Sequence, residues 1–328
     1  MPLVLSQPDR PAGRRRVLTP PPVAALATEL GLPLLQPERA VDALAALRAA
    51  EPTAIAICAY GQLLPAELLA ICPWLNLHPS LLPRWRGAAP IERALMAGDE
   101  ATGVAIMETV LALDEGPLVA VAPIPLTPEF DTAALEAEAL RLGVPALVQA
   151  LVAAADGSLS ATPQAPTGAT YAAKLERADR LVDPLVHGVQ ETLDRIRALR
   201  PQIGALLALD DETFTIWRAR SVVDPLAAGA VVVDGERLLV GLSDGAVELV
   251  ELQTAGKRAL ATPEWLRGRR TLPARATRPA CRRATPPAPL PSTSCCARKK
   301  RTPGSIAPSA PRPRVPGSIR ATAASPRS

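Results

Sequence analysis

The sequence predicts an α/β domain built on a mainly parallel β-sheet, followed by a small β-barrel and a disordered basic tail. Three observations carry this prediction. Short apolar runs alternate with helix-like segments up to residue 157, the pattern then changes to β-hairpins, and beyond Arg270 large apolar residues almost disappear. The chain has 328 residues, of which 48% are hydrophobic, and is therefore long enough for roughly two domains with cores of their own.

In the first domain, short and mostly apolar runs bounded by proline or glycine predict buried strands. They lie at residues 53–60, 74–80, 103–110 and 117–126. Helix-like stretches surround them at 22–32, 65–71 and 89–98, and a longer one begins at Asp131, where Asp131 and Thr132 are the expected caps. Because strands and helices alternate, we expect a mainly parallel sheet with helices on both faces. Such sheets bind ligands at the carboxyl ends of their strands.

After a linker with glycine, proline and threonine, the pattern is that of hairpins. Asp234-Gly235 and Asp244-Gly245 are turn signals between runs of alternating valine and leucine, and several short strands at this spacing predict a small barrel or sandwich. A last helix is expected at "TPEWLRGRR", with Thr262 as its cap and Pro263 in its first turn. The expected organisation is a first domain at 1–157, a linker with a connecting helix at 158–199, the barrel at 200–270 and the disordered tail at 271–328.

The positive charge of the chain is concentrated in this tail. Residues 271–328 contain twelve lysines and arginines and no acidic residue, so residues 1–270 carry 24 basic and 32 acidic side chains, a net charge of −8. Five cysteines without a CxxC pair or a histidine at ligand spacing predict no metal site. With no apolar run of membrane-spanning length and no signal-like start, we expect a soluble cytoplasmic protein that does not enter a membrane.

Polar side chains at the end of the strand predicted at 74–80 are candidates for chemistry. Asn76 and His78 are two residues apart, so on a strand they point to the same side. A carboxamide donor beside an imidazole suits the stabilisation of a tetrahedral oxyanion. Asp114 follows the next strand, and if the sheet brings it near His78, its carboxylate can orient the imidazole or accept a proton. The alternatives are a structural, hydrogen-bonded histidine and an aspartate that caps a loop.

Six segments, in order along the chain, closely resemble those of bacterial methionyl-tRNA formyltransferases. They are "QPDRPAGRRR" (7–16), "AYGQLLP" (59–65), "LNLHPSLLPRWRGAAPIERAL" (75–95), "LDEGP" (113–117), "TYAAKL" (170–175) and "LQTAGKRAL" (252–260). Together they span nearly all of residues 3–270, and the long central motif is highly specific. The resemblance implies that a formyl group is transferred from 10-formyltetrahydrofolate to the α-amino group of methionine on initiator tRNA, for translation initiation. It also implies a Rossmann-like domain followed by a barrel resembling an OB-fold.

The same resemblance assigns roles to individual residues. Asn76, His78 and Asp114 match the family's catalytic asparagine, histidine and aspartate. The turn that matches its folate-contacting segment consists of Ser80, Leu81, Leu82 and Pro83. A projecting basic loop is expected to bind the acceptor arm of the tRNA through Arg10, Arg14, Arg15 and Arg16. Folate is a cosubstrate, neither a metal nor a nicotinamide is implied, and the protein is expected to be a monomer.

Both ends of the chain depart from the family pattern. Members usually begin with a strand, a glycine-rich turn and a helix, whereas Met1 lies six residues upstream of Gln7, so we expect an N-terminally truncated catalytic domain without its first strand. The proline, alanine and arginine bias of the tail resembles that of a GC-rich gene translated in a shifted reading frame. Two other functions stay open, namely a formyltransferase acting on a small amine such as glycinamide ribonucleotide, and an inactive RNA-binding or defective gene product. The first should lack the basic loop and the barrel, and the second would hold RNA by the charge of its tail.

Overall fold

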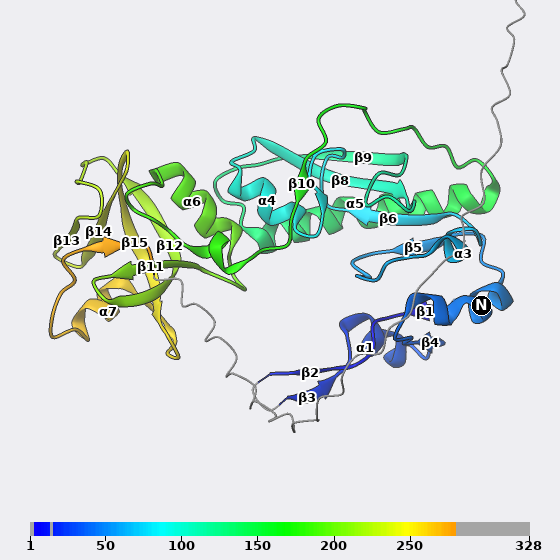
Figure 1. Ribbon diagram of the computed structural model, residues 1–328, viewed down its shortest axis with the longest axis horizontal. Coiled ribbons are helices and arrows are strands. Elements are labelled where there is room, and N and C mark those ends of the chain that lie inside the picture. Colours follow the sequence, from blue (N-terminus) through cyan, green and yellow to red (C-terminus); the bar gives the residue numbers. More distant parts are fainter. Residues whose placement is uncertain (1–2, 14–15, 280–328) are drawn as a thin grey trace, which may run out of the picture. The chain divides into compact units, whose positions relative to one another are not determined.

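The computed structural model of the protein describes residues 3–13 and 16–279, and it has the predicted architecture of an α/β domain followed by an antiparallel barrel (Figure 1). Residues 280–328, which make up most of the predicted tail, lie outside the described residues, and so does most of the segment predicted to come from a shifted reading frame. Residues 271–279 of the tail are described and contain a strand of the barrel.

The first strands form a small parallel pair. β1 (Val4–Leu5) pairs with β4 (Leu34–Leu35), and α1 (Pro22–Glu29) connects them, with Pro22 in its first turn, where a missing N–H costs nothing. Between β1 and α1, β2 (Arg10–Ala12) and β3 (Val17–Thr19) form an exposed antiparallel hairpin. The segment predicted to be a projecting basic loop therefore contains a two-stranded ribbon.

A second helical region follows, which the sequence patterns did not predict. A 3-10 turn (Ala40–Ala43) leads into α2 (Leu44–Ala50), which ends at Glu51 in a left-handed conformation with φ of 46°. The alanine-rich sequence of α2 leaves only Leu47 fully buried, so its apolar period is weak. Leu47 packs in one cluster with Leu68 of α3 (Ala66–Leu69) and with Trp74.

The sheet that carries the candidate site has four strands in the order β5-β6-β8-β9. The four predicted strands are confirmed with shorter or shifted bounds as β5 (Ile55–Ile57), β6 (Trp74–His78), β8 (Ala101–Glu108) and β9 (Leu118–Pro125). Only β5 and β6 are parallel, whereas β8 runs antiparallel to both β6 and β9. This sheet is therefore mixed rather than mainly parallel, since the short loop at 109–117 joins β8 to β9 as a hairpin and leaves no room for a crossover.

Two helices pack on this part of the chain, α4 (Pro90–Met96) and α5 (Thr132–Asp156). α5 runs along β6, β8 and β9 (Figure 1), and a Cβ atom on Gly143 would lie 2.8 Å from side-chain atoms of Leu77 and Val104, so helix and sheet pack closely. Asp131 caps α5 by accepting a 2.9 Å hydrogen bond from Ala134 N, as predicted, whereas Thr132 donates to the carbonyl of Ala198 instead. By length and composition alone α5 could also span a membrane.

The linker after α5 folds back onto the first domain before it reaches the barrel. Thr162 pairs with Leu118 of β9 in an isolated bridge, and β10 (Tyr171–Ala172) runs parallel to β7 (Arg86–Gly87). A 3-10 turn (Arg177–Arg180) and α6 (Val189–Ala198) complete this region.

The barrel is an antiparallel sheet in the order β13-β14-β15-β12-β11-β17, with β16 paired to β15. The predicted turn at Asp234-Gly235 joins β13 to β14, and Asp244 stands in the turn before β15. In its core Phe214 meets Trp265 edge to face, with ring centroids 5.3 Å apart. The elements are β11 (Ala205–Leu209), β12 (Glu212–Val222), β13 (Val231–Asp234), β14 (Arg237–Leu242), β15 (Gly245–Thr254), β16 (Ala259–Ala261), α7 (Thr262–Arg267) and β17 (Ala276–Thr277).

Two predictions for the end of the barrel need correction. The N-cap of α7 is Ala261, and Thr262 is the first helical residue; its hydroxyl donates to the carbonyl of Leu249 and accepts from no N–H of its own helix. Pro263 does stand in the first turn. β17 pairs with β11, and the Asp210 side chain accepts a hydrogen bond from the backbone N–H of Arg275, so the barrel continues past the predicted boundary at Arg270.

Candidate functional site

His78 is the last residue of β6 and is buried, with 4% of its surface exposed. Its Nε2 atom lies 2.9 Å from the carbonyl oxygen of Trp85. Because a carbonyl oxygen can only accept, Nε2 carries the hydrogen of this bond. The other ring nitrogen, Nδ1, lies 3.7 Å from Oδ2 of Asp114, which is close for an ion pair and long for a hydrogen bond. The fold thus places Asp114 beside His78, which was the condition for the carboxylate to act on the imidazole.

Asn76 lies two residues before His78 on β6 and is half-buried. In the antiparallel ladder with β8, Asn76 is opposite Met107 and His78 is opposite Ala105, so both side chains stand on the same face of the strand. Within the described residues no protein group is hydrogen-bonded to the carboxamide of Asn76. A carboxamide donor therefore stands available beside the imidazole.

Asp114 is held by a loop with little conformational freedom. Its own φ is +52°, and its Oδ2 accepts a 2.8 Å hydrogen bond from the N–H of Gly87. Two residues on, a Cβ atom on Gly116 would lie 1.6 Å from the carbonyl oxygen of Glu108, so only glycine fits there. Within "LDEGP", Gly116 thus lets the chain turn close to the end of β8, and the turn places the carboxylate near His78.

The side chain of Gln164 links the loop around Asp114 to β7. Its Nε2 donates to the carbonyl oxygens of Asp114, at 2.7 Å, and of Gly116, at 2.8 Å. Its Oε1 accepts from Nε and Nη2 of Arg86, which also forms a 2.9 Å ion pair with Glu115. Gln164 lies in the predicted linker, 50 residues beyond Asp114, and no local pattern in the sequence marks it.

A second group of residues fixes the carbonyl that His78 contacts. Trp85 has φ of +64°, and its indole N–H donates to Oδ2 of Asp99 at 2.7 Å. The guanidinium of Arg84 also binds Asp99, through contacts of 2.9 and 2.6 Å, and it stacks 4.4 Å from the centroid of the Trp85 ring. The backbone N–H of Trp85 donates to the hydroxyl of Thr170. Sequence reasoning missed Asp99 as well, because the contact joins two separate loops.

The predicted folate-contacting turn, Ser80 to Pro83, follows β6 directly. Ser80 is fully buried and its hydroxyl donates to the carbonyl of Arg84, while Leu82 packs against Ala105 and Met107. Leu81 and Pro83 are half-buried. The backbone N–H groups of Leu81 and Leu82 donate to no protein acceptor among the described residues. The side chains of Ser80 and Leu82 thus shape the turn.

The predicted tRNA-binding arginines lie on the exposed β2–β3 hairpin, as far as the structure describes them. Arg10 is exposed on β2 and donates to Oε1 of Gln7, and Arg16 is exposed beside β3 with φ of +49°. Arg14 and Arg15 lie outside the described residues. No hydrogen bond or ion pair within residues 3–13 and 16–279 joins Arg10 or Arg16 to His78 or Asp114.

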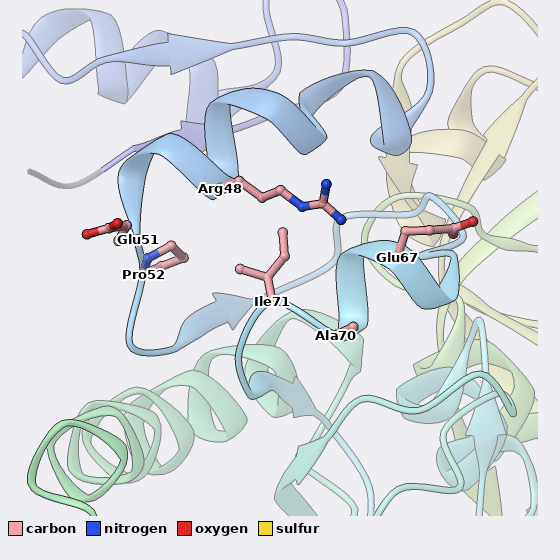
Figure 2. A pocket seen from close by; sticks show the side chains of 6 residues that line it. All are labelled: Arg48, Glu51, Pro52, Glu67, Ala70 and Ile71. Atoms are coloured by element: carbon pink, nitrogen blue, oxygen red, sulfur yellow. The ribbon is translucent and has the colours of Figure 1, made fainter.

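Two pockets lie in the first domain and the linker that follows it. The one in Figure 2, of about 360 Å³, lies between α2 and α3, where Arg48 extends from α2 toward the helix that carries Glu67, and it contains no predicted site residue. The other, of about 450 Å³, is lined by Arg86, Glu115 and Gln164 among others. It therefore adjoins the loop that holds Asp114.

The sequence matches two family models. Residues 1–151 match the formyl transferase family and residues 174–270 match the formyl transferase C-terminal domain. The chain is 41% identical to a methionyl-tRNA formyltransferase of Aromatoleum aromaticum over 273 residues, which cover 82% of this chain and 86% of that protein. It is 42% identical to the enzyme of that name from Methylobacillus flagellatus over 272 residues, covering 81% of this chain and 88% of the other.

Solved structures agree at the level of the fold. A crystal structure of HypX from Aquifex aeolicus in complex with tetrahydrofolic acid superposes with a TM-score of 0.56 at 21% identity, over 73% of this chain and 43% of that one. The sugar 3N-formyl transferase WlaRD gives 0.55 at 13% identity, over 74% of this chain and 83% of that one. On its match to both family models and its identity to these relatives, the chain belongs to the formyl transferase family.

Proposed function

We propose that this protein transfers the formyl group of 10-formyltetrahydrofolate to the α-amino group of methionyl-tRNA. Two findings support this reaction. The relatives that share about two fifths of its sequence over most of both chains are named methionyl-tRNA formyltransferases. The observation that supports the chemistry is a group of three side chains: the buried imidazole of His78, the carboxylate of Asp114 at 3.7 Å from it, and the carboxamide of Asn76 on the same strand as His78, which has no hydrogen-bond partner among the described residues.

In the proposed step the methionine nitrogen attacks the formyl carbon and a new C–N bond forms. Negative charge develops on the formyl oxygen, and N–H donors from Asn76 and from Nδ1 of a protonated His78 stabilise it. The bond from the formyl carbon to N10 of the folate then breaks, and its electron pair stays on N10, which takes up a proton. Asp114 accepts the proton that the amine loses, which balances the proton that N10 takes up.

The turn from Ser80 to Pro83 is proposed to hold the folate beside this group. The backbone N–H group of Leu81, which has no protein acceptor among the described residues, matches the hydrogen-bond acceptors of a pterin ring, while Leu81 and Pro83 offer apolar surface. Because Ser80 and Leu82 are buried and engaged within the protein, they would act by keeping the turn in shape. The folate supplies the one-carbon group, and the protein supplies orientation and electrostatics.

The acceptor is proposed to be bound through the exposed hairpin at 10–19. Arginine suits an acceptor arm because its planar guanidinium holds phosphates and stacks on unpaired bases. Arg10 and Arg16 are exposed there, and Arg14 and Arg15 are the two residues between the described parts of the hairpin. We further propose that the protein acts as a cytoplasmic monomer, with α5 serving as a core helix of the sheet rather than as a membrane span.

The test is formyl transfer from 10-formyltetrahydrofolate by the full chain, with methionyl-tRNA and glycinamide ribonucleotide offered as separate acceptors. The proposal predicts formylated methionyl-tRNA and no product with the small amine. Transfer to the small amine alone would favour a small-amine formyltransferase. A folded protein that transfers to neither acceptor but binds RNA in a salt-sensitive way would favour an inactive RNA-binding product.

A further inference from the structure

We infer that Gln164, in the linker that follows the first domain, is a positioning residue that sets the place of Asp114 relative to His78. This inference rests on the proposed function only in that it names Asp114 as part of the reacting group. If Gln164 acts in this way, the linker is part of the site, whereas the sequence patterns placed it outside the first domain.

The contacts of Gln164 converge on the loop around Asp114. Its Nε2 donates two hydrogen bonds to carbonyl oxygens of that loop, those of Asp114 at 2.7 Å and Gly116 at 2.8 Å. Its carbonyl oxygen accepts from Arg86 at 3.1 and 2.8 Å. A carboxamide is the side chain that can donate twice and accept twice in this way, so the donor and acceptor pattern matches glutamine and no charged residue.

The backbone of the loop is left-handed at its key residue. Asp114 has φ of +52°, a region in which aspartate and asparagine are the commonest residues after glycine. Its side chain is fixed from the other direction, by the N–H of Gly87 at 2.8 Å. Gly87 follows Arg86 directly, so the side chains of Gln164 and Asp114 bind adjacent residues of β7. Loss of one tie would let the carboxylate move relative to the imidazole.

The linker is anchored independently of Gln164, so the residue can be changed without releasing the segment. β10 pairs with β7 at Tyr171↔Arg86 and Ala172↔Gly87, and Thr162 exchanges backbone hydrogen bonds with Leu118. The hollow of about 450 Å³ beside Gln164 gives space for a substituted side chain. Substitution should therefore act on the Asp114 loop rather than on the fold.

The inference is tested with Gln164→Met, which keeps the length of the side chain and removes its N–H donors, and with Gln164→Glu, which keeps the acceptor for Arg86. Both variants should lower kcat for formyl transfer roughly ten- to a hundredfold, the scale of a small misplacement of a reacting group, while KM for folate and tRNA changes less than about twofold. The matched control is Gln149→Met on the exposed face of α5, which should behave as wild type.

A double-mutant cycle separates positioning from a general structural effect. If Gln164 acts through Asp114, Gln164→Met should cost nothing further in an Asp114→Asn background. A multiplicative loss of kcat in the double variant, or an unchanged kcat in both single variants, would overturn the inference. If Gln164→Met does not fold, Gln164→Glu decides by the same cycle.

Amide hydrogen exchange at Gly87 gives a readout that needs no activity. Gln164→Met and Asp114→Asn should both speed exchange of this N–H by about tenfold or more, because its bond to Oδ2 of Asp114 weakens, while Gln149→Met leaves it unchanged. An inactive wild-type chain with this exchange pattern would refute the proposed function and keep the inference. Unchanged exchange in Gln164→Met and Gln164→Glu would refute the inference whatever the activity.

Discussion

The carboxylate of Asp99 accepts a 2.7 Å hydrogen bond from the indole N–H of Trp85. This bond helps to position Trp85, whose carbonyl oxygen binds His78 in the candidate site. Trp85 has a left-handed backbone conformation, and its carbonyl oxygen is the partner of Nε2 in His78. Arg84 adds two more hydrogen bonds to the same carboxylate. Asp99 therefore helps to fix which nitrogen of His78 carries the hydrogen, and it does so without touching His78.

Replacing Asp99 with asparagine should weaken this arrangement. The –NH2 group that replaces Oδ1 would face Nη2 of Arg84, which is also a donor, so this hydrogen bond is lost and we expect a loss of about 1–3 kcal/mol in the free energy of unfolding. We also expect a fall in kcat of roughly tenfold, because the imidazole is less well oriented. Chemical denaturation and steady-state kinetics measure the two effects. Glu100→Gln, at the exposed neighbouring position, is the control, and equal behaviour of the two variants would contradict the role of Asp99.

Gly116→Ala should disrupt the loop that carries Asp114. A Cβ atom there would lie 1.6 Å from the carbonyl oxygen of Glu108, so the end of β8 or the loop must move. We expect formyl transfer to fall at least about a hundredfold, on the scale of a misplaced reacting group. Gly268→Ala is the matched control, because its Cβ would meet its nearest atom, the Trp265 carbonyl oxygen, at 3.5 Å. An active Gly116→Ala enzyme would show that the placement of Asp114 tolerates a large shift.

Local sequence patterns predicted the part of the site that lies on one strand. The period of two along β6 placed Asn76 and His78 on one side, and the run that became β8 led to Asp114. The direction of β8 and β9 was not predictable from these runs, since apolarity does not distinguish parallel from antiparallel pairing. Gln164 and Asp99 were missed for a different reason. Their partners come from other loops, and only the folded chain brings a glutamine of the linker to the carbonyl of Asp114.

The barrel should lose stability in acid through Glu248. Burial acts to raise the pKa of this carboxyl, but hydrogen bonds from Arg237 and Arg220 outweigh burial and hold the pKa below its usual value. A lowered pKa in the folded state means that the stabilisation is present above the unfolded value and is lost as the pH falls through the folded value. Glu248→Gln should remove roughly 1–2 kcal/mol at neutral pH and flatten the decline in acid.

Equilibrium unfolding of wild type and Glu248→Gln from about pH 6 to about pH 3 measures this effect. The control is Glu251→Gln, since that carboxylate is 36% exposed and lies 3.5 Å from an exposed arginine, a pair of little expected value. Parallel curves for wild type and Glu248→Gln would show that the charge of Glu248 is not what stabilises the barrel in this range.

Changing Arg14, Arg15 and Arg16 together to alanine should affect the tRNA and spare the folate. We expect a higher KM for methionyl-tRNA and a slope of log KM against log salt that is smaller by about 2–3, because three phosphate-binding charges are lost. The KM for folate should not change. Arg141→Ala, at a paired and exposed position of α5, is the control. Unaltered kinetics across the salt series would make this hairpin a solvated charged segment and favour a small acceptor.

The most direct test of the account is the single-turnover rate of formyl transfer to methionyl-tRNA by Asn76→Ala and His78→Ala. Each variant should fold, bind both substrates, and transfer the formyl group roughly a hundred- to a thousandfold more slowly than wild type, the loss expected for one oxyanion donor. Rates near those of wild type in both variants, with folding and binding intact, would contradict the claim that these two side chains stabilise the reacting formyl group.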